Sequence, residues 1–586
     1  MVDADNGQPP PDPTPAEQAG PIERPSRRGF LTGAVAGAAG VVAGAAGGYA
    51  VGSATSRGQV VTDPTVAPRP EGTGFDHLVV VMFENRSFDN LLGYLYEGPD
   101  GESTPAGQTF EGLQGDHSNP APDGTRIPAH PHEGPTDEIM RKPDPDPGEE
   151  YPYVNTQLFG TIDPESNRSH DLPNLKAPFN APRSDASPTM EGFVIDYVDK
   201  FRGEHHREPT VDEYRQIMGN FVPNMLPVFS TLARSFAIYD HWHCAVPSQT
   251  FPNRSFFHAS SSHGFVTNGL GGYDKWLDPD RNQATTIFNR LQDAGVPWGV
   301  YYDDRQLISL TGLLHAPQLE PYWKTNFHTM STFYEQAANG TLPAYAFIEP
   351  RMLYDHNDMH PPVGPITGID VDQTELTGGI SDVRSGDALL HEVYAAIRTS
   401  AASTGSNALN TVLLVTFDEH GGTYDHVPPP SATPPHAQKS TEMGFGFDRL
   451  GVRVPAMVVS AYTPAGTIIN DEMHHGSLIA TLCERYGLDP LTKRDDGATT
   501  LRNAVTLAQP RDPSTWPTTF PLFIPTNPES KDPIHDGQED HPLSPPGVGL
   551  MSMLVARYGE PGEPVPHTYR EAWASVRKHG QGLFGE

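Results

Sequence analysis

The sequence predicts an α/β fold in which a mostly parallel central sheet is flanked by helices. The first observation is a set of short, continuous apolar runs, which are typical of strands that are buried on both faces. The second is that segments with helical spacing lie between these runs, as parallel strands require. The third is the presence of 61 prolines and 57 glycines at a hydrophobic content of only 36%, which indicates long, loop-rich insertions around the sheet.

The elements of this sheet are predicted from five apolar runs and three helical segments. The expected strands are His77–Met82, Val296–Tyr302, Ala344–Ile348, Thr411–Phe417 and Val454–Ser460. The expected helices are Thr285–Ala294, Asp387–Arg398 and Ser477–Tyr486, the first and last of which are followed by a glycine that can end a helix. Since strands and helices alternate, we expect one sheet rather than separate domains.

The remaining segments suggest how the chain is divided. Residues from Gly98 to about Pro188 lack periodicity and are expected to lie over the edge of the sheet as extended loops. No long, low-complexity divider follows residue 74, so residues 75–520 are expected to form one catalytic domain. Residues 521–586 are then a C-terminal extension, packed on that domain or following it, with a helical pattern near Tyr569–Lys578.

The N-terminus indicates an export signal. Arg27 and Arg28 precede a mildly apolar, Gly/Ala-rich segment that ends near Ala54, which is the pattern of a twin-arginine signal over residues 1–54. A transmembrane anchor is the alternative, but a segment so rich in glycine and alanine is weakly hydrophobic. We expect export by the twin-arginine machinery to the cell envelope or medium, with residues 55–74 as a linker.

Charge and cysteine content narrow the partners. The chain has 39 basic and 73 acidic residues, a net charge of −34, which disfavours nucleic acid and any general attraction to an anionic membrane. Any lipid substrate would therefore be met by a local surface, through transient contact with the membrane. Cys244 and Cys483 are the only cysteines, so the chain is neither a disulfide scaffold nor a cysteine-based zinc protein.

Two predicted strands end on oxygen-bearing side chains. Glu84-Asn85 follows the first apolar run and Asp418-Glu419 follows the fourth. Because ligands of parallel sheets bind beyond the carboxyl ends of the strands, these four side chains are expected to meet at one edge. Three carboxylates and an amide oxygen would repel one another unless a cation lies among them. We therefore predict a divalent metal site formed by Glu84, Asn85, Asp418 and Glu419, although either pair alone would more often be the polar start of a loop.

A candidate nucleophile lies in the segment QTFPNR. Thr250 stands two residues before a proline and four before Arg254. The proline restricts the turn, so that the hydroxyl can be presented, and Asn253 and Arg254 can hold anionic oxygens by directed hydrogen bonds. Alone, this pattern is weak; beside a metal site it predicts Thr250 as a nucleophile with Asn253 and Arg254 as substrate-binding residues.

Five segments, taken in order, resemble a known family. ENRSFDNLLG, QTFPNR, DEHGGTYDHVPPP, GVRVPAMVVS and HHGSLIATLCERYG are similar to the phosphoesterase family of bacterial and plant non-specific phospholipases C and related acid phosphatases, a branch of the alkaline phosphatase superfamily. The resemblance covers about Phe75 to Leu488. It implies an alkaline-phosphatase-like fold, one or two divalent metal ions bound by the two pairs named above, and a phosphorylated intermediate on Thr250.

The resemblance also suggests proton donors for the leaving alcohol. His360, His426 and His475 are the imidazoles closest to the family's positions. Asp425 could orient His426 or simply cap a turn. Many family members have a DPxH-like segment, but here Asp146-Pro147-Gly148-Glu149 has no histidine, so Glu149, a displaced residue such as His170, or nothing takes that place.

These observations favour a secreted, metal-dependent phospholipase C-type phosphodiesterase. An acid phosphatase that acts on phosphomonoesters is the alternative, and threonine at position 250, where acid phosphatases have serine, favours the phospholipase C branch. A sulfatase is disfavoured because its nucleophile arises from cysteine or serine. A secreted metal-binding protein with a degenerate site would not need a nucleophile beside the ligands.

Overall fold

The fold is built on one central sheet whose inner strands are buried on both faces. The computed structural model describes residues 75–585 except 134–136, 183–185, 354–355, 363–381, 401, 403, 437–440 and 522–541, so the export signal and the linker predicted before Phe75 lie outside the described residues. In spatial order the eight strands are β13 (Thr467–Ile469), β6 (Ala237–Tyr239), β12 (Ala456–Val459), β11 (Thr411–Phe417), β1 (His77–Phe83), β10 (Tyr345–Glu349), β8 (Trp298–Tyr302) and β9 (Phe327–Thr329).

The sheet is mostly parallel, as the sequence predicts. Within it β12 alone runs antiparallel to its neighbours β11 and β6, and the other pairings are parallel. All five predicted strands are present, with β11 at the predicted bounds. The strands β6, β9 and β13 have three residues each, which is too short for a run of apolar residues to identify them.

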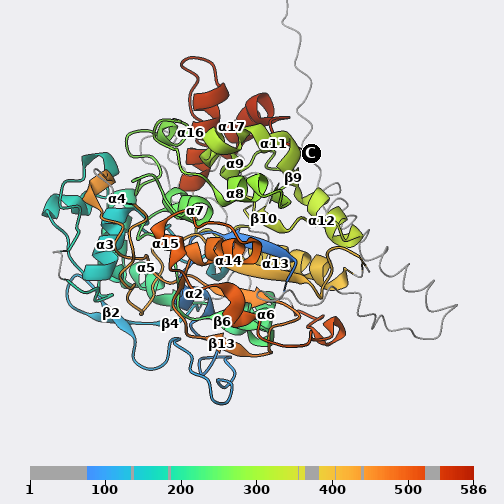
Figure 1. Ribbon diagram of the computed structural model, residues 1–586. Helices are drawn as coiled ribbons and strands as arrows, with labels where there is room; N and C mark the ends of the chain where they lie inside the picture. The colour runs from blue at the N-terminus through green and yellow to red at the C-terminus, as the bar shows by residue number, and fades with distance from the viewer. Residues whose placement is uncertain are drawn as a thin grey trace, which may run out of the picture. The chain divides into compact units, whose positions relative to one another are not determined.

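Helices cover both faces of the sheet (Figure 1). Val80 of β1 is in register with both Phe347 and Leu414, and side chains alternate along a strand, so Phe347 and Phe417 point to opposite faces. Phe257 of α7 (Thr250–Ala259) packs on Phe347, whereas Phe229 of α6 (Pro227–Ser235) packs on Phe417. The two helices therefore lie on opposite faces, which confirms the flanked, mostly parallel α/β architecture.

The three predicted helices are present with slightly different ends. They are α8 (Ile287–Asp293), α13 (Val383–Thr399) and α14 (Gly476–Tyr486). The other α-helices, several of them a single turn, are α2 (Phe88–Leu92), α3 (Tyr151–Phe159), α4 (Phe193–His205), α5 (Val211–Arg215), α9 (Leu310–Leu314), α10 (Ala316–Leu319), α11 (Trp323–Asn326), α12 (Met330–Asn339), α15 (Lys493–Asp496), α16 (Pro545–Tyr558) and α17 (Tyr569–Ser575). Short two-stranded sheets pair β2 (Ser118–Pro120) with β3 (Arg126–Pro128), β4 (His130–Pro131) with β5 (Gly219–Asn220), and β7 (Trp242–His243) with β14 (Met473–His474).

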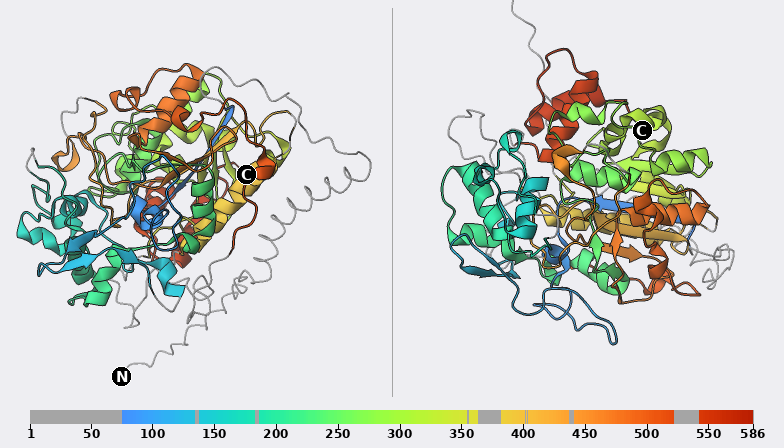
Figure 2. Two further views of the ribbon diagram at one scale, coloured as in Figure 1. Left: turned by 90° about the horizontal axis from the view of Figure 1, so that it is seen from below. Right: turned by 60° about the vertical axis from the view of Figure 1, so that its left-hand side comes forward.

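The segment from Gly98 to Pro188 is more ordered than expected. It includes α3, which packs against α4, and the two helices lie together beside the sheet in both views of Figure 2. The prediction of extended loops missed α3 because nearly all its residues are buried, so that no polar face gives the helix a visible period in the sequence. This segment brings Asp146 and Glu149 to the carboxyl edge of the sheet, as described below.

The C-terminal helices pack against the rest of the described chain. α16 contacts α9, and the ring of Phe584 packs against Trp323 of α11 and Phe327 of β9. The predicted helical pattern near Tyr569–Lys578 corresponds to α17 and the turn that follows it. Among the described residues, no helix combines the length and the apolar character needed to cross a bilayer.

Candidate active site

The carboxyl ends of β1 and β11 bring the two predicted metal-binding pairs together. Phe83 and Phe417 are partners in register, so Glu84 and Asp418 leave the sheet side by side. The backbone N–H of Asn85 donates to Asp418 Oδ1 at 3.2 Å, and that of Glu419 donates to the same oxygen at 2.7 Å. Glu84, Asn85, Asp418 and Glu419 are all fully buried. The two pairs are therefore neighbours at the carboxyl edge of the sheet, and their role as metal ligands stays a prediction.

Close packing of the two loops depends on Gly421. Its φ of +59° lies in the left-handed region, and a Cβ at this position would stand 2.5 Å from Asn85 Cβ. The N–H of Gly421 donates to Glu419 Oε2 at 2.8 Å. Glycine therefore lets the β11 loop approach Asn85 closely enough to share hydrogen bonds with it.

Thr250 stands at the first turn of α7 and faces these carboxylates. Its Oγ1 donates to Glu84 Oε2 at 3.3 Å, and the side chain is fully buried. The N-terminus of α7 is fixed by its neighbours, since Asn268 Oδ1 accepts from the N–H of Phe251 at 2.8 Å. A hydroxyl at a helix N-terminus beside a carboxylate suits an attack on an anionic group.

Arg254 lies one helical turn after Thr250 and joins both strand ends. Its guanidinium donates from Nη2 to Glu84 Oε1 and from Nε to Asp418 Oδ2, the latter at 3.3 Å. Its Nη1 is buried and has no hydrogen-bond partner among the described residues. One donor of this guanidinium thus remains available for an anionic ligand.

Burial disfavours the charged form of the carboxyl groups in this cluster. Burial raises the pKa of Glu84 well above its ordinary value, and the Asp418 charge adds to the effect while Arg254 opposes it. Burial and the charge of Glu149 likewise raise the pKa of Glu419 well above the ordinary range. Arg254 alone does not neutralise the carboxylates that meet here.

The donor set of the cluster fits a divalent cation. Asn85 Oδ1 and Glu419 Oε1 are buried oxygens that have no hydrogen-bond partner among the described residues. Buried oxygens are normally hydrogen-bonded, so two of them unpaired beside further carboxylates point to a missing positive partner. Glu84, Asn85, Asp418 and Glu419 are the residues that would hold it.

A second group of side chains adjoins this cluster through Asn85. Asn85 Nδ2 donates to Glu149 Oε2 at 3.2 Å, and Glu149 Oε1 lies 3.8 Å from His360 Nε2. Asp146 is the third member of this group, and its Oδ1 lies 4.0 Å from His360 Nδ1. Of the alternatives left open by the sequence, Glu149 occupies the place beside the cluster, whereas His170 stacks on Tyr153 and pairs with Asp196 at 3.3 Å.

The three predicted catalytic histidines have different surroundings. His475 is held between Trp242 Nε1, which donates to its Nδ1 at 3.3 Å, and the main-chain oxygen of Asp418, to which Nε2 donates at 2.6 Å. Burial lowers the pKa of His475 to about 4, so it is neutral near pH 7 and positions Asp418. Burial also lowers the pKa of His360 to about 4, but its Nε2 has no hydrogen-bond partner among the described residues.

His426 belongs to a different network. Its Nδ1 pairs with Asp89 at 2.6 Å, its ring packs on His117, and its Nε2 lies 3.4 Å from Glu111. Asp89, and not Asp425, therefore orients His426. Asp425 instead accepts from Arg453 Nε at 3.0 Å and from the N–H of Val427 at 2.9 Å, as a turn-capping residue does.

Asn253 is engaged by the backbone. Its Nδ2 donates to the carbonyl oxygens of Val246, Ser248 and Gln249, and its Oδ1 accepts from the N–H of Val246. In this structure the amide therefore stabilises the turn that presents Thr250. A direct contact of Asn253 with substrate stays a prediction.

Besides His360, the loop after β10 contributes Asp358, which the sequence did not identify. The main-chain oxygen of Asp358 accepts from the N–H of Glu84 at 2.8 Å, and its carboxylate pairs with His356 at 3.0 Å. Burial by itself would raise the pKa of Asp358, but the charge of His356 outweighs burial, and the net shift is downward. The signal was present in HNDMHPP, a polar cluster after a predicted strand like the other two pairs.

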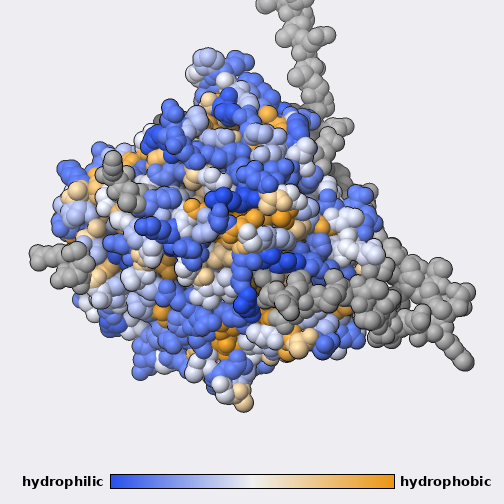
Figure 3. All heavy atoms as spheres, in the orientation of Figure 1, coloured by the Kyte–Doolittle hydropathy of each residue, from blue (hydrophilic) through white to orange (hydrophobic). Residues whose placement is uncertain are grey.

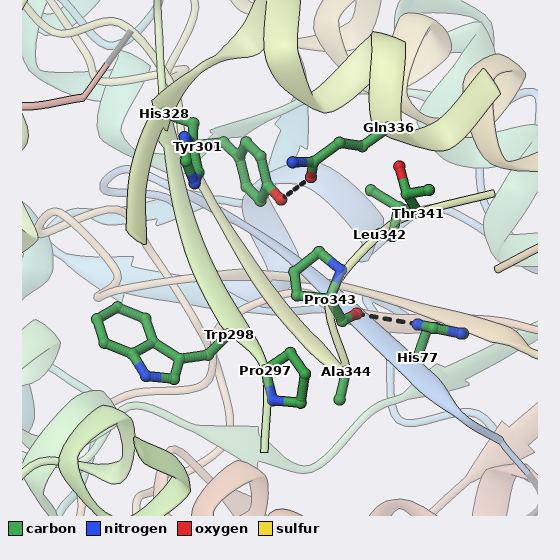
Figure 4. Close-up of a pocket in the computed structure, with 10 residues that line it drawn as sticks. All are labelled: His77, Pro297, Trp298, Tyr301, His328, Gln336, Thr341, Leu342, Pro343 and Ala344. Atoms are coloured by element: carbon green, nitrogen blue, oxygen red, sulfur yellow. Dashed lines mark hydrogen bonds between the residues drawn. The ribbon is translucent and has the colours of Figure 1, made fainter. Parts of the chain in front are cut away.

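A pocket of about 350 Å³ lies away from this cluster, along α12 and the amino ends of three strands (Figure 4). Its lining includes His77, Pro297 and Ala344, which begin or precede β1, β8 and β10, together with Trp298 and Tyr301. The metal-binding pairs lie at the carboxyl ends of the strands. This pocket is therefore separate from the candidate active site.

Sequence comparison identifies the family. A sequence model described as the Phosphoesterase family matches residues 75–489. The chain belongs to the Phosphoesterase family. Non-specific phospholipase C3 of Arabidopsis thaliana is 29% identical over 503 residues, which cover 82% of each protein, and non-specific phospholipase C6 of the same plant is 30% identical over 466 residues, 76% of this chain and 75% of that one. The non-hemolytic phospholipase C of Pseudomonas aeruginosa is 24% identical over 450 residues, 70% of this chain and 54% of that one.

Solved structures match this phosphoesterase only weakly. The lipoteichoic acid synthase LtaP from Listeria monocytogenes has a TM-score of 0.31 at 13% identity, covering 48% of this chain and 70% of that one. A protein in the alkaline phosphatase superfamily from Vibrio parahaemolyticus has a TM-score of 0.28 at 12% identity, and the match covers 46% of this chain and 63% of that one. The family assignment rests on the sequence match, which confirms the predicted resemblance: this phosphoesterase is a hydrolase that acts on phosphoric ester bonds.

Proposed function

We propose that the protein is a secreted, divalent-metal-dependent phosphodiesterase of the phospholipase C type that acts through a phosphothreonine on Thr250. The observation that carries this proposal is the hydrogen bond of 3.3 Å from Thr250 Oγ1 to Glu84, inside the cluster where Asn85, Asp418 and Glu419 also converge. Relatives named non-specific phospholipase C, at 29–30% identity over most of the chain, support a phosphodiester substrate.

The first half-reaction follows from the contacts of Thr250. As Oγ1 attacks phosphorus, its proton passes to Glu84 Oε2, which already accepts the hydrogen bond. The bond from phosphorus to the leaving oxygen breaks on the opposite side, and that oxygen takes a proton from solvent water to leave as the alcohol. A divalent cation held by Glu84, Asn85, Asp418 and Glu419 would lower the pKa of the hydroxyl and neutralise charge on the phosphoryl oxygens. The N-terminus of α7 adds a favourable dipole at the same position.

Arg254 is suited to hold the phosphate. Two of its nitrogens are used by Glu84 and Asp418, which fix the plane of the guanidinium, and the unpartnered Nη1 can donate to an equatorial oxygen. Water then attacks the phosphothreonine and releases one proton to solvent, the phosphorus–Oγ1 bond breaks, and the proton on Glu84 returns to Thr250 Oγ1. Of the three predicted histidines, His360 alone has an unpartnered nitrogen directed at the adjoining carboxylates.

A substrate panel tests this function. Hydrolysis of phosphatidylcholine and p-nitrophenyl phosphorylcholine should exceed hydrolysis of p-nitrophenyl phosphate, and a chelator should abolish it. A preference for the monoester would instead identify an acid phosphatase. Thr250→Ala should eliminate the phosphoenzyme trapped by acid quenching, whereas Thr250→Ser should retain it; normal turnover by Thr250→Ala would exclude this nucleophile.

Contact with a membrane would be local and transient. Among the described residues the exposed large hydrophobic side chains are Val211 and Trp573, at 56% and 43% exposure. The face drawn in Figure 3 is mostly hydrophilic, with small hydrophobic areas between polar ones. Such a surface suits brief encounters with a lipid headgroup better than stable insertion.

Export is proposed from the sequence alone. Replacing Arg27 and Arg28 with lysine should retain the protein in the cytoplasm of a host with a working twin-arginine pathway. Fractionation followed by immunoblotting measures this. Equal export of the lysine variant would refute the twin-arginine route without affecting the catalytic proposal.

A further inference from the structure

Asp146, Glu149 and His360 form a buried cluster that the proposed mechanism does not use. One ligand atom from each of the three lies within 4.8 Å of the others, and all three side chains are buried. Asp146 comes from the segment before α3, and His360 from the loop after β10. Tertiary folding therefore brings distant parts of the chain into one polar cluster beside Asn85.

The facing atoms of this cluster lack protein partners. Asp146 Oδ1, Glu149 Oε1 and His360 Nε2 are each buried without a hydrogen bond among the described residues. Unpaired polar atoms of this kind are rare in folded proteins, because each costs about 1–3 kcal/mol of desolvation. Glu149 Oε1 lies 3.8 Å from His360 Nε2, and Asp146 Oδ1 lies 4.0 Å from His360 Nδ1. Three unpaired atoms gathered in one buried cluster indicate that a positively charged ligand belongs there.

The orientation of His360 is that of a metal ligand. Its Nδ1 lies 2.6 Å from the main-chain oxygen of Pro361 and donates to it, and its backbone N–H donates to Asp358 Oδ1 at 3.1 Å. These bonds fix the ring and leave Nε2 as an electron-pair donor. Such a hydrogen bond on the far nitrogen is what orients histidine ligands in metal sites.

Nearby basic side chains are not hydrogen-bonded to the three unpaired atoms. Lys200, whose charge acts on Asp146, forms an ion pair with Glu204 at 2.9 Å. Arg86, which is also influenced by Asp146, donates from Nε to Met359 O at 2.7 Å and from Nη1 to Lys142 O at 2.5 Å. Neither side chain forms a hydrogen bond with the three facing atoms.

The spacing of the cluster suits a small divalent ion. Ligands about 2.1 Å from an octahedral ion are roughly 3 Å apart when adjacent and about 4.2 Å apart when opposite. The separation of 3.8 Å between Glu149 Oε1 and His360 Nε2 lies in this interval. A mixed set of carboxylates and imidazole favours a transition metal such as Mn²⁺ over Ca²⁺.

We propose that Asp146, Glu149 and His360 bind a second divalent transition-metal ion, adjacent to the one expected at Glu84, Asn85, Asp418 and Glu419. The inference rests on the proposed function for the first ion. Asn85 joins the two sites, since it belongs to the first and donates to Glu149 of the second. Glu149 stands where the related DPxH-like segments have histidine, and it adds the negative charge that a second cation requires. His360 is then a metal ligand and does not donate a proton.

Metal stoichiometry tests the inference independently of activity. The exported form of the chain is stripped with chelator, dialysed against Mn²⁺ and analysed for metal and protein content. Wild type should bind two Mn²⁺ per chain, and Glu149→Gln and His360→Gln should bind one. Glu150→Gln is the matched control, because Glu150 is the neighbouring residue and makes no side-chain cap to α3; it should bind two.

The outcomes separate this inference from the proposed function. Wild type that binds a single ion, or Glu149→Gln that still binds two, would overturn the second site even if phosphodiester hydrolysis is normal. Loss of both ions in Glu149→Gln, with circular dichroism unchanged, would show one shared site and also overturn it. Two ions in wild type and one in Glu149→Gln, without hydrolysis of any ester, would support the second site and refute the phospholipase C proposal.

Discussion

Substitution of Gly421 by alanine tests how closely the β11 loop must approach Asn85. The added Cβ would lie 2.5 Å from Asn85 Cβ, whereas ordinary contact begins at 3.4 Å, so one of the two loops must move by about 0.9 Å. A displacement of this size at a catalytic constellation costs roughly 100-fold in rate, which is about 2.7 kcal/mol in activation free energy. The φ of +59° adds about 1 kcal/mol of conformational destabilisation for alanine.

Gly487→Ala separates these two effects. Gly487 has a φ of +65° at the end of α14, but a Cβ there would meet no atom within 4 Å. Gly487→Ala should lower the thermal midpoint about as much as the positive φ at Gly421 does in Gly421→Ala, and it should leave kcat/KM unchanged. Both quantities are measured for wild type and for the two variants with a chromogenic phosphodiester. If Gly421→Ala kept wild-type kcat/KM, the close approach to Asn85 would not matter for catalysis and the assignment of Asn85 to the site would be refuted.

Three further predictions concern other contacts. Arg254→Met should reduce kcat/KM by at least 100-fold because the phosphate loses a charged donor, and it should lower the thermal midpoint because the buried Glu84 and Asp418 lose their partner; wild-type rates would exclude a role in phosphate binding. His475→Gln should lower activity equally from pH 5 to 8, since the pKa of His475 is lowered to about 4 by burial; loss of one limb of the pH–rate profile would instead identify a proton donor. Burial lowers the pKa of His426, but the charge of Asp89 outweighs burial, so the net shift is upward. This pair therefore stabilises the fold fully below about pH 6.5 and less as pH rises through the folded-state pKa. As pH rises through that range, the free energy of unfolding in urea should fall by up to about 1.4 kcal/mol per pH unit more in wild type than in His426→Gln, and parallel curves would contradict the ion pair.

The sequence by itself determined the central sheet and the position of the two pairs predicted to bind metal. β1 and β11 are continuous apolar runs, and such runs become buried strands wherever they occur in an α/β chain. Because parallel strands end at the same edge, Glu84 and Asp418 could be placed together before any coordinates were known. Thr250 could be predicted as the nucleophile from its residue type and its spacing of four residues from Arg254, because residues four apart lie on the same face of α7.

The tertiary structure decided which remaining polar residues join the site. Asp146 and Glu149 come from a proline-rich segment without periodicity, and only the packing of α3 and α4 brings them beside Asn85. The histidines show the same limit, since His475 is turned to the Asp418 carbonyl and His426 to Asp89, whereas His360 faces Glu149. A side chain's partners depend on contacts between residues that are hundreds of positions apart, and local patterns carry no record of such contacts.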